Sequence, residues 1–461
     1  MDCLVLCDFG STYTKLTAVD PEKEEIVGTS KAYTTVQTDI FDGFTEAVDR
    51  LRQQLGDFHI LDMKACSSAA GGLRMVVSGL VPELTAEAAR MAALGAGAKV
   101  VKVFHHEMTD EDIESLENLK PDIFLLTGGT DGGNSACILE NAEILAESSI
   151  DVPILIAGNR TALRKIRKIF DAAGKDYRVC ENVMPRLQQL NIKPAQDQIR
   201  EIFLKRIIQA KGLSRIDDMI SDILLPTPAA VLSAVKILAE GTEHEKGIGE
   251  LLCVDPGGAT TDVYSIAEGG PTEVNTVLKG LPEPYEKRTV EGDIGMRYSI
   301  HGIIEAGGAE RVAERAGLTV DEVLTYTKEL AKHTDRLPEN EILQRLDDAL
   351  AATAVETAVA RHCGRIEEVY TPCGKTFAQT GKDLRELRQI IVTGGALIHS
   401  PSVYEITQAA AWSPSDPTSL RPRTFDVLVD KKYILSAMGV LSQTEPDMAL
   451  RIMKKELVKC H

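Results

Sequence analysis

Short apolar runs that stop at acidic or glycine-containing turns recur along the chain and predict buried β-strands. They lie at residues 3–7, 122–126, 152–157, 251–254 and 390–392. Compact runs bounded by turn residues are typical of strands that are buried on both faces of a sheet. Stretches with a helical period of apolar residues lie between and after them, at 195–220, 227–236, 303–362 and 433–459. This alternation predicts an α/β protein.

Two features of the pattern predict how the chain divides. A polar stretch with several glycines at 241–249 is typical of a linker, and it places a first domain at 1–245 and a second at 246–461. Within the first domain, strand, glycine turn, helix and strand follow one another at about 100–186. That order predicts a small parallel α/β unit inserted into the first domain.

Composition narrows the class of protein. The chain has 461 residues, a net charge of −18 and only 5% aromatic residues. So acidic a chain repels phosphate backbones, which argues against a nucleic-acid partner. The sequence starts without a basic leader and has no apolar run long enough to span a bilayer, so we expect a cytoplasmic protein without a membrane partner. None of the nine cysteines forms a CxxC pair, so no zinc or iron–sulfur site is indicated.

The first strand delivers an acid to a glycine turn with hydroxyl side chains, Asp8, Gly10, Ser11 and Thr12, and Lys15 follows. Backbone N–H groups and hydroxyls of such a turn can bind phosphate oxygens, and a carboxylate can hold hydrated Mg²⁺. The alternative is an ordinary hairpin turn with exposed hydroxyls, since short glycine motifs also arise by chance.

Two later strands end in related turns. The run 251–254 leads into a turn of acids, glycines and hydroxyls, whose expected contributors are Asp255, Gly257, Gly258, Thr260, Thr261 and Asp262. The run 390–392 leads into the bare turn Gly394, Gly395 and Ala396, where missing side chains permit close approach of a flat ring or a sugar. A hairpin and a strand-to-helix turn are the alternatives, but two acidic copies in one chain favour a function.

The order of these motifs resembles the ATPase superfamily of actin, sugar kinases and the seventy-kilodalton heat-shock proteins. The resemblance implies two actin-like, ribonuclease H-like α/β domains around a nucleotide cleft. It also implies that the two acidic turns hold the phosphates of ATP, and that Asp8 and Asp255 hold Mg²⁺. Lys15, Thr261 and Asp262 would take part in catalysis, and the bare glycine turn would lie behind the adenosine. Residues 228–232 look like one crossing helix, and 433–459 like a second that packs back on the first domain.

A narrower resemblance rests on the segments at 67–75, 127–134, 182–185 and 255–262. Together they resemble the glutamate mutase accessory proteins, a family called GlmL or MutL. The resemblance implies an ATP-driven reactivating factor that releases damaged cobalamin from an adenosylcobalamin-dependent aminomutase. For the glycine loop Thr127 to Asn134 we expect a partner surface or a rim of the cleft. A second nucleotide site is disfavoured because no lysine follows, as it would in a Walker loop.

The sequence departs from the heat-shock protein pattern at one position, and two other protein classes remain as alternatives to a reactivating factor. Heat-shock proteins carry an acid before the Pro-Thr of the hinge helix, whereas here Pro226 takes that place and Asp222 is near but not aligned, which leaves the catalytic base open. The first motif is also similar to that of 2-hydroxyacyl-CoA dehydratase activators, which are shorter and hold an iron–sulfur cluster. A small-molecule kinase or a hydantoinase-type enzyme on the same fold is the second alternative.

Overall fold

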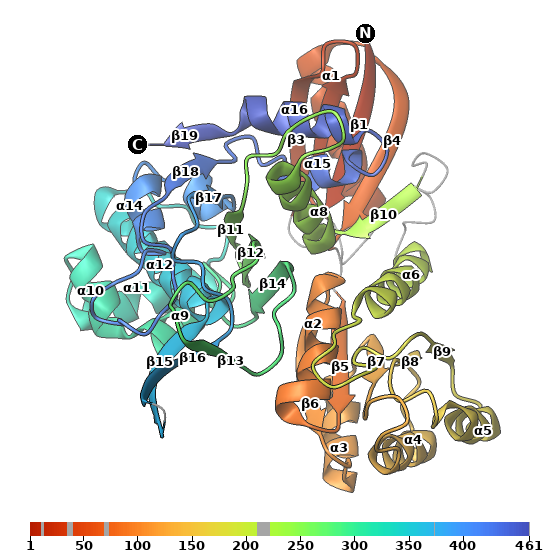
Figure 1. Ribbon diagram of the computed structural model, residues 1–461. Helices are drawn as coiled ribbons and strands as arrows, with labels where there is room; N and C mark the ends of the chain where they lie inside the picture. The colour runs from red at the N-terminus through yellow and green to blue at the C-terminus, as the bar shows by residue number, and fades with distance from the viewer. Residues whose placement is uncertain (11–12, 35–39, 69–72, 210–221, 373, 461) are drawn as a thin grey trace. The chain divides into compact units, whose positions relative to one another are not determined.

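The chain forms two compact units in a computed structural model that describes residues 1–460 except 11–12, 35–39, 69–72, 210–221 and 373 (Figure 1). Unit 1 comprises Met1–Ala234, Gly280–Pro282 and Ser436–Ala449, and unit 2 comprises Val235–Lys279, Glu283–Leu435 and Leu450–His461. The boundary therefore falls inside three helices, α8 (Thr227–Glu240), α15 (Leu435–Leu441) and α16 (Pro446–Glu456). The segments 280–282 and 436–449 belong to unit 1 although they follow parts of unit 2 along the chain, and the hydrophobic pattern of the sequence does not indicate this.

A mixed five-stranded sheet forms the first part of unit 1. Its order is β3-β2-β1-β4-β10, with bounds Glu25–Tyr33, Tyr13–Asp20, Asp2–Phe9, His59–Ser67 and Asp222–Pro226. The first three strands are antiparallel, and β4 and β10 run parallel to β1. Helix α1 (Ile40–Leu55) covers the sheet because its apolar side chains, among them Phe44 and Leu51, recur at helical spacing and join the same core.

A second, wholly parallel sheet is inserted between β4 and β10 in chain order. Its order is β6-β5-β7-β8-β9, with bounds Lys99–His105, Arg74–Gly79, Ile123–Leu126, Ile154–Ile156 and Tyr177–Val179. Helices α2 (Glu87–Gly95) and α6 (Lys193–Gln209) share a core with one face. The other face packs on α3 (Asp110–Leu119), α4 (Ala136–Glu147) and α5 (Leu163–Ala173). The sheet thus begins at Arg74 and not near residue 100, because β5 comes first along the chain and pairs on both sides.

Unit 2 repeats the order of the first mixed sheet. The order is β14-β12-β11-β17-β18-β19, with bounds Glu286–Glu291, Thr261–Ile266, Leu251–Pro256, Gln389–Val392, Asp426–Val429 and Val458–Cys460. Its helices are α9 (Ile300–Gly307), α10 (Ala309–Ala316), α11 (Val320–Lys332), α12 (Glu341–His362), α13 (Gly395–Ile398) and α14 (Val403–Gln408). A separate sheet joins β13 (Thr276–Lys279), β16 (Gly374–Thr380) and β15 (Arg365–Thr371).

The strand order confirms the predicted fold class. If the strands of each mixed sheet are numbered in chain order, the first five lie across the sheet in the order third, second, first, fourth, fifth in both. The first three strands are antiparallel in each, and the fourth and fifth run parallel to the first. Two copies of this arrangement, with an α/β insertion in the first, are the actin-like domains that the order of motifs implied.

The expectation of one helix at 433–459 is wrong. Helix α15 (Leu435–Leu441) ends, α16 begins at Pro446, and β19 pairs antiparallel with β18. The pyrrolidine ring disfavours helical geometry in the residue before it, so the helical pattern breaks there. Within the described ranges, no helix has the length and apolar character needed to cross a bilayer.

Candidate functional site

Each of the two predicted acidic turns joins the strands of a hairpin, and the two hairpins have the same strand register. Asp8 of β1 pairs with Lys15 of β2, and Asp255 of β11 pairs with Asp262 of β12, in each case seven positions later. The N–H of Gly10 donates to the carbonyl of Tyr13 at 3.1 Å, and that of Gly257 donates to the carbonyl of Thr260 at 2.8 Å. The hairpin alternative and the functional interpretation therefore coincide, because the candidate phosphate turn is itself the hairpin.

Asp8 joins three elements of unit 1. Its buried carboxylate accepts hydrogen bonds from the hydroxyls of Thr227, at the start of α8, and Ser436, in α15, at 2.7 and 2.9 Å. Hydrogen bonds to a charged group contribute about 1.5–3 kcal/mol each. We therefore expect removal of this carboxylate to weaken the fold as well as any metal site.

Asp255 lies beside the bare glycine turn in unit 2. Gly394 has φ of 89°, and a Cβ atom placed there would lie 2.7 Å from Asp255 Oδ1 and 2.8 Å from the Pro256 carbonyl oxygen. No side chain fits that space without displacing the acid. Gly395 has no such neighbour and begins α13, with Ala396 half-buried behind it. The structure thus brings the second and third predicted turns together.

The two catalytic candidates on β12 are held by the body of unit 2. Asp262 accepts from Nε of the buried Arg288 at 2.8 Å and pairs with its Nη2 at 2.6 Å, while Thr260 donates to its other oxygen at 3.3 Å. Burial is the largest single influence on the pKa of Arg288 and lowers it, but the charges of Asp262 and Tyr264 and the hydrogen bonds to both side chains together raise this pKa above its ordinary value. The fully buried Thr261 donates its hydroxyl to the Ile294 carbonyl. These contacts favour structural roles, and catalysis by either side chain stays a prediction.

The exposed part of the second hairpin is held by a following loop. The N–H groups of Met296, Arg297 and Tyr298 donate to the carbonyls of Gly257 and Gly258 at 2.8–2.9 Å. These three hydrogen bonds order the turn that we expect to bind phosphate. In the first hairpin, Lys15 lies directly across from Asp8, whereas Ser11 and Thr12 lie outside the described residues.

Cysteines beside both acids are protonated thiols. Burial raises the pKa of Cys66 and Cys253 well above the ordinary value, and the nearby carboxylates of Asp8 and Asp255 add to the shift. Burial also raises the pKa of Cys363 to about 12. Since the thiolate is the reactive form, none of these side chains is suited to nucleophilic chemistry.

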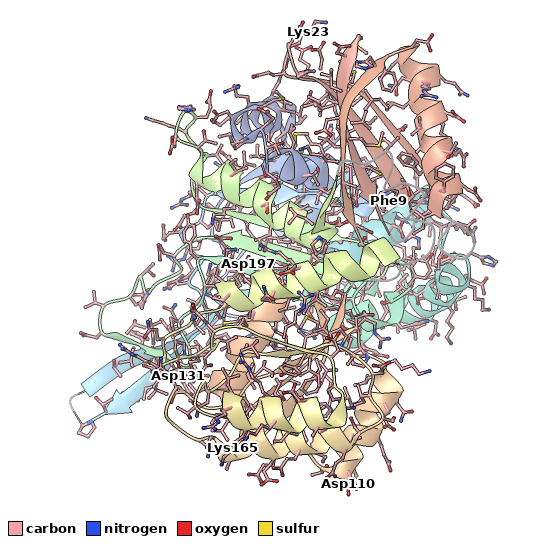
Figure 2. All side chains as sticks on the ribbon, turned by 90° about the vertical axis from the view of Figure 1, so that its right-hand side faces the viewer. Phe9, Lys23, Asp110, Asp131, Lys165 and Asp197 are labelled. Atoms are coloured by element: carbon pink, nitrogen blue, oxygen red, sulfur yellow. The ribbon has the colours of Figure 1, made fainter. Side chains whose placement is uncertain are left out.

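The glycine loop Thr127 to Asn134 is closely packed on its neighbours. A Cβ at Gly129 would lie 2.0 Å from the Asn134 carbonyl oxygen. Buried Asn159 accepts from the Gly132 N–H and donates to the carbonyls of Gly133 and Asn134, and Asn182 donates to the Gly129 carbonyl and to the Asp131 carboxylate. Asp131 of this loop is labelled in Figure 2. The glycines are explained by this packing, which gives a rigid platform at the carboxyl edge of the parallel sheet.

Sequence reasoning missed four residues around the turns. Thr227 and Ser436 bind Asp8, and Arg288 binds Asp262. Asp430 accepts from the N–H groups of Ile434 and Leu435 and from the Thr393 hydroxyl. Two of the four had a local signal: Thr227 lies in the Pro-Thr-Pro start of a helix, and Asp430 binds N–H groups only four and five residues later. Ser436 and Arg288 bind acids that are 428 and 26 residues away, where no spacing rule applies.

Comparison with known proteins gives one family. The sequence profile described as MutL protein matches residues 4–457. The chain is 50% identical over 461 residues to Protein MutL of Clostridium tetanomorphum, covering 100% of each chain.

Solved structures give weaker likenesses. One is the activator of the 2-hydroxyisocaproyl-CoA dehydratase from Clostridium difficile with bound ADPNP, which is 10% identical with a TM-score of 0.32, covering 100% of this chain and 99% of that one. Another is ligand-bound xylulose kinase from Lactobacillus acidophilus, 10% identical with a TM-score of 0.37, covering 100% and 93%.

Proposed function

The chain belongs to the MutL protein family, and on that basis we propose that it is a cytoplasmic, ATP-dependent reactivating factor for an adenosylcobalamin-dependent glutamate mutase or a related aminomutase. In this role it acts as a chaperone-like protein. It binds a mutase that holds damaged cobalamin and, with ATP, allows intact coenzyme to replace it. The family membership supports the partner, and the geometry of the turns supports the use of ATP.

The observation that carries the use of ATP is the matched pair of acidic hairpins. Asp8 and Asp255 occupy equivalent positions at the ends of equivalent strands, and each is followed by a glycine turn of the same register. Hard carboxylate oxygens with bound waters suit Mg²⁺, and turn N–H groups suit phosphate. We propose that both hairpins take part in binding Mg²⁺ and ATP.

Some glycines of these turns are required by packing within the chain, and others leave the turns open to a bound nucleotide. Side chains are excluded at Gly10 and Gly394, where a Cβ would lie 2.6 Å and 2.7 Å from the nearest atoms. The exposed Gly258 and Gly395 leave room for a ligand outside the turn. When bound, ATP supplies free energy through hydrolysis. This chain's residues then act by orienting phosphate oxygens and by holding Asp255 in place beside Gly394.

ATP can change the affinity for the mutase only through a difference in its own contacts with two conformations of this protein. The proposal therefore requires that mutase binding and ATP binding affect each other. Equal affinity for ATP with and without the mutase would contradict that coupling.

The test is recovery of an inactivated aminomutase. Wild-type protein, ATP, Mg²⁺ and fresh coenzyme should release hydroxocobalamin and restore turnover. Asp255→Asn keeps the shape but removes the charge, and it should abolish recovery while the thermal midpoint stays near that of wild type. Asp49→Asn is the matched control, because it removes the same charge from an exposed position on α1 and should recover fully.

Replacing Thr261 and Asp262 together is a poorer test, because both side chains hold unit 2 together. If wild-type protein fails with every adenosylcobalamin-dependent aminomutase of its host, the proposed function is wrong. ATP turnover with a small acceptor alone would then favour the kinase or hydantoinase alternative.

A further inference from the structure

The three-stranded sheet β13-β16-β15 of unit 2, here called the arm, carries an unusual concentration of exposed apolar side chains. In the described part of the chain, the large exposed apolar residues on or next to it are Val274, Val277, Leu278, Val369 and Tyr370. The strand register puts Tyr370 and Leu278 on one face and Val369 and Val277 on the other. Both faces of the arm are therefore partly apolar and exposed, which is typical of a surface that meets another protein.

The outer edge of the arm can accept a further strand. Ile366 of β15 donates its N–H to the Thr418 carbonyl at 2.9 Å, and Arg365 forms an antiparallel bridge with Ser419. Because N–H and C=O groups alternate along a strand, the same side of β15 carries those of Glu368 and Tyr370. No other described residue pairs with these two positions on that side. Natural proteins usually cover such edges, since an open edge pairs readily with another strand.

The charges on β15 indicate which kind of segment would pair with its open edge. Glu367 and Glu368 lie on opposite faces of β15, and within the described residues Glu368 alone of the two has a counter-ion, Lys375 at 2.6 Å on the inner strand β16. Two copies of a chain with a net charge of −18 repel each other over long range, which disfavours self-pairing. An extended segment that carries lysine or arginine opposite Glu367 meets the edge favourably.

We propose that the arm is a docking site at which the partner protein adds an extended, basic segment to the edge of β15. Main-chain hydrogen bonds to Glu368 and Tyr370 would give affinity, and the exposed apolar and acidic side chains would give specificity. The identity of the partner as an aminomutase rests on the proposed function. The docking geometry rests on unit 2 alone.

The test uses the full chain and purified aminomutase subunits of the host, with affinity measured by calorimetry. Tyr370→Pro removes an outward N–H without touching a bond to β16, and proline is tolerated at such edge positions. It should weaken binding about tenfold, the effect of one lost hydrogen bond with its partner left unpaired. Tyr370→Ser keeps the N–H and should weaken binding less than Tyr370→Pro does. Glu367→Lys should also weaken binding and reduce its salt dependence.

Two controls keep the outcomes apart. Leu337→Ser removes an equally exposed apolar side chain, 75% exposed against 78% for Tyr370, outside the arm, and it should bind like wild type. ATP affinity and thermal midpoint should be unchanged in the arm variants.

If wild type binds the mutase and both Tyr370→Pro and Glu367→Lys bind equally well, the docking site is wrong and the proposed function stands. Wild type that binds no mutase overturns both. Self-association that Tyr370→Pro abolishes would make a second copy the occupant and overturn the proposal.

Discussion

Asp8 and Asp255 have equivalent positions in their hairpins but different neighbours. Hydroxyls of Thr227 and Ser436 hold Asp8, whereas Asp255 lies against a glycine that has no side chain. The chain positions of the two acids were predicted from short motifs. Their neighbours were not, because Thr227 and Ser436 lie 219 and 428 residues away from Asp8.

The neighbouring glycines of the third turn give a matched pair of variants. Gly394→Ala places a Cβ against Asp255 at a φ of 89°, so we expect it to lower the free energy of unfolding by more than about 1 kcal/mol. Gly395→Ala meets no neighbouring atom and should leave stability within about 1 kcal/mol.

Denaturation in urea measures both, and calorimetry measures their affinity for Mg²⁺ and ATP. If the bare turn lies behind the nucleotide, Gly395→Ala should weaken ATP binding although its stability is unchanged. Full affinity in that variant would remove the bare turn from the site.

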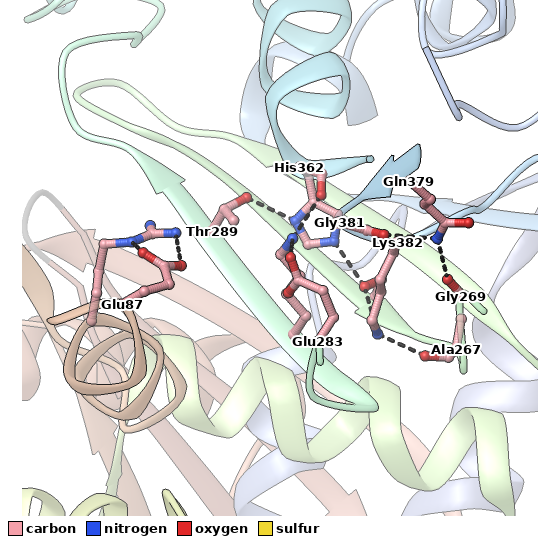
Figure 3. Close-up of polar contacts among 12 residues, drawn as sticks. Glu87, Ala267, Gly269, Glu283, Thr289, His362, Gln379, Gly381 and Lys382 are labelled. Carbon is pink, nitrogen blue, oxygen red and sulfur yellow. Dashed lines mark hydrogen bonds and ion pairs between the residues drawn. The ribbon is translucent and has the colours of Figure 1, made fainter. Parts of the chain in front are cut away.

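At the scale of elements, a buried polar cluster joins β12, β14, α12 and the end of the arm (Figure 3). The fully buried Lys382 donates to the carbonyls of Ala267 and Tyr285, each at 2.7 Å. Buried His362 lies between the hydroxyls of Thr289 and Ser265, both at 2.8 Å. Burial and the charges of Lys287 and Lys382 hold the pKa of His362 well below its ordinary value, so this histidine is neutral. The cluster fixes the base of the arm to the mixed sheet.

Lys382 predicts a pH dependence of stability. Burial, followed by the charge of Lys287, lowers its pKa from 10.5 to about 7. Between those two values the unfolded chain holds a proton that the folded chain does not, so the free energy of unfolding rises with pH. The slope is at most about 1.4 kcal/mol per pH unit.

We expect the stability difference between wild type and Lys382→Met to grow in favour of wild type from pH 7 to pH 10. Urea denaturation at each pH measures the free energy of unfolding of both proteins. Taking the difference between them cancels the contributions of other groups that titrate in both. Lys328→Met removes the same charge from an exposed helix position and should show no such trend. A difference that does not vary with pH would mean that Lys382 stays protonated in the fold.

Elements themselves were well predicted where the pattern was strong. The apolar runs at 3–7, 122–126, 251–254 and 390–392 lie within or overlap β1, β7, β11 and β17. The tail was wrong, because its helical period continues through Pro446 and hides both the break and the short strand β19. A strand of three residues forms only because β18 offers a partner, and that partner is set by the fold.

At the scale of the whole molecule, the two units have separate apolar cores. Leu125 lies in a core of unit 1 and Leu350 in the core of unit 2, and both are fully buried. Replacing such a residue with alanine typically costs about 2–5 kcal/mol.

We therefore expect Leu350→Ala to speed amide hydrogen exchange mainly in unit 2, and Leu125→Ala mainly in unit 1. Exchange followed by mass spectrometry of peptides measures both, and each variant is the control for the other. An equal rise in both units for either variant would show that the chain opens as one cooperative body.

The sequence by itself determined the α/β class, the order of the three turns and the family, because these depend on local patterns and on motifs read along the chain. Only the tertiary structure decided which side chains hold the acids, that β5 begins the inserted sheet, and that Thr261 and Asp262 are bound within unit 2. The physical reason is that burial and hydrogen bonding are set by neighbours in space. Those neighbours come from segments tens to hundreds of residues apart, and no local pattern encodes their meeting.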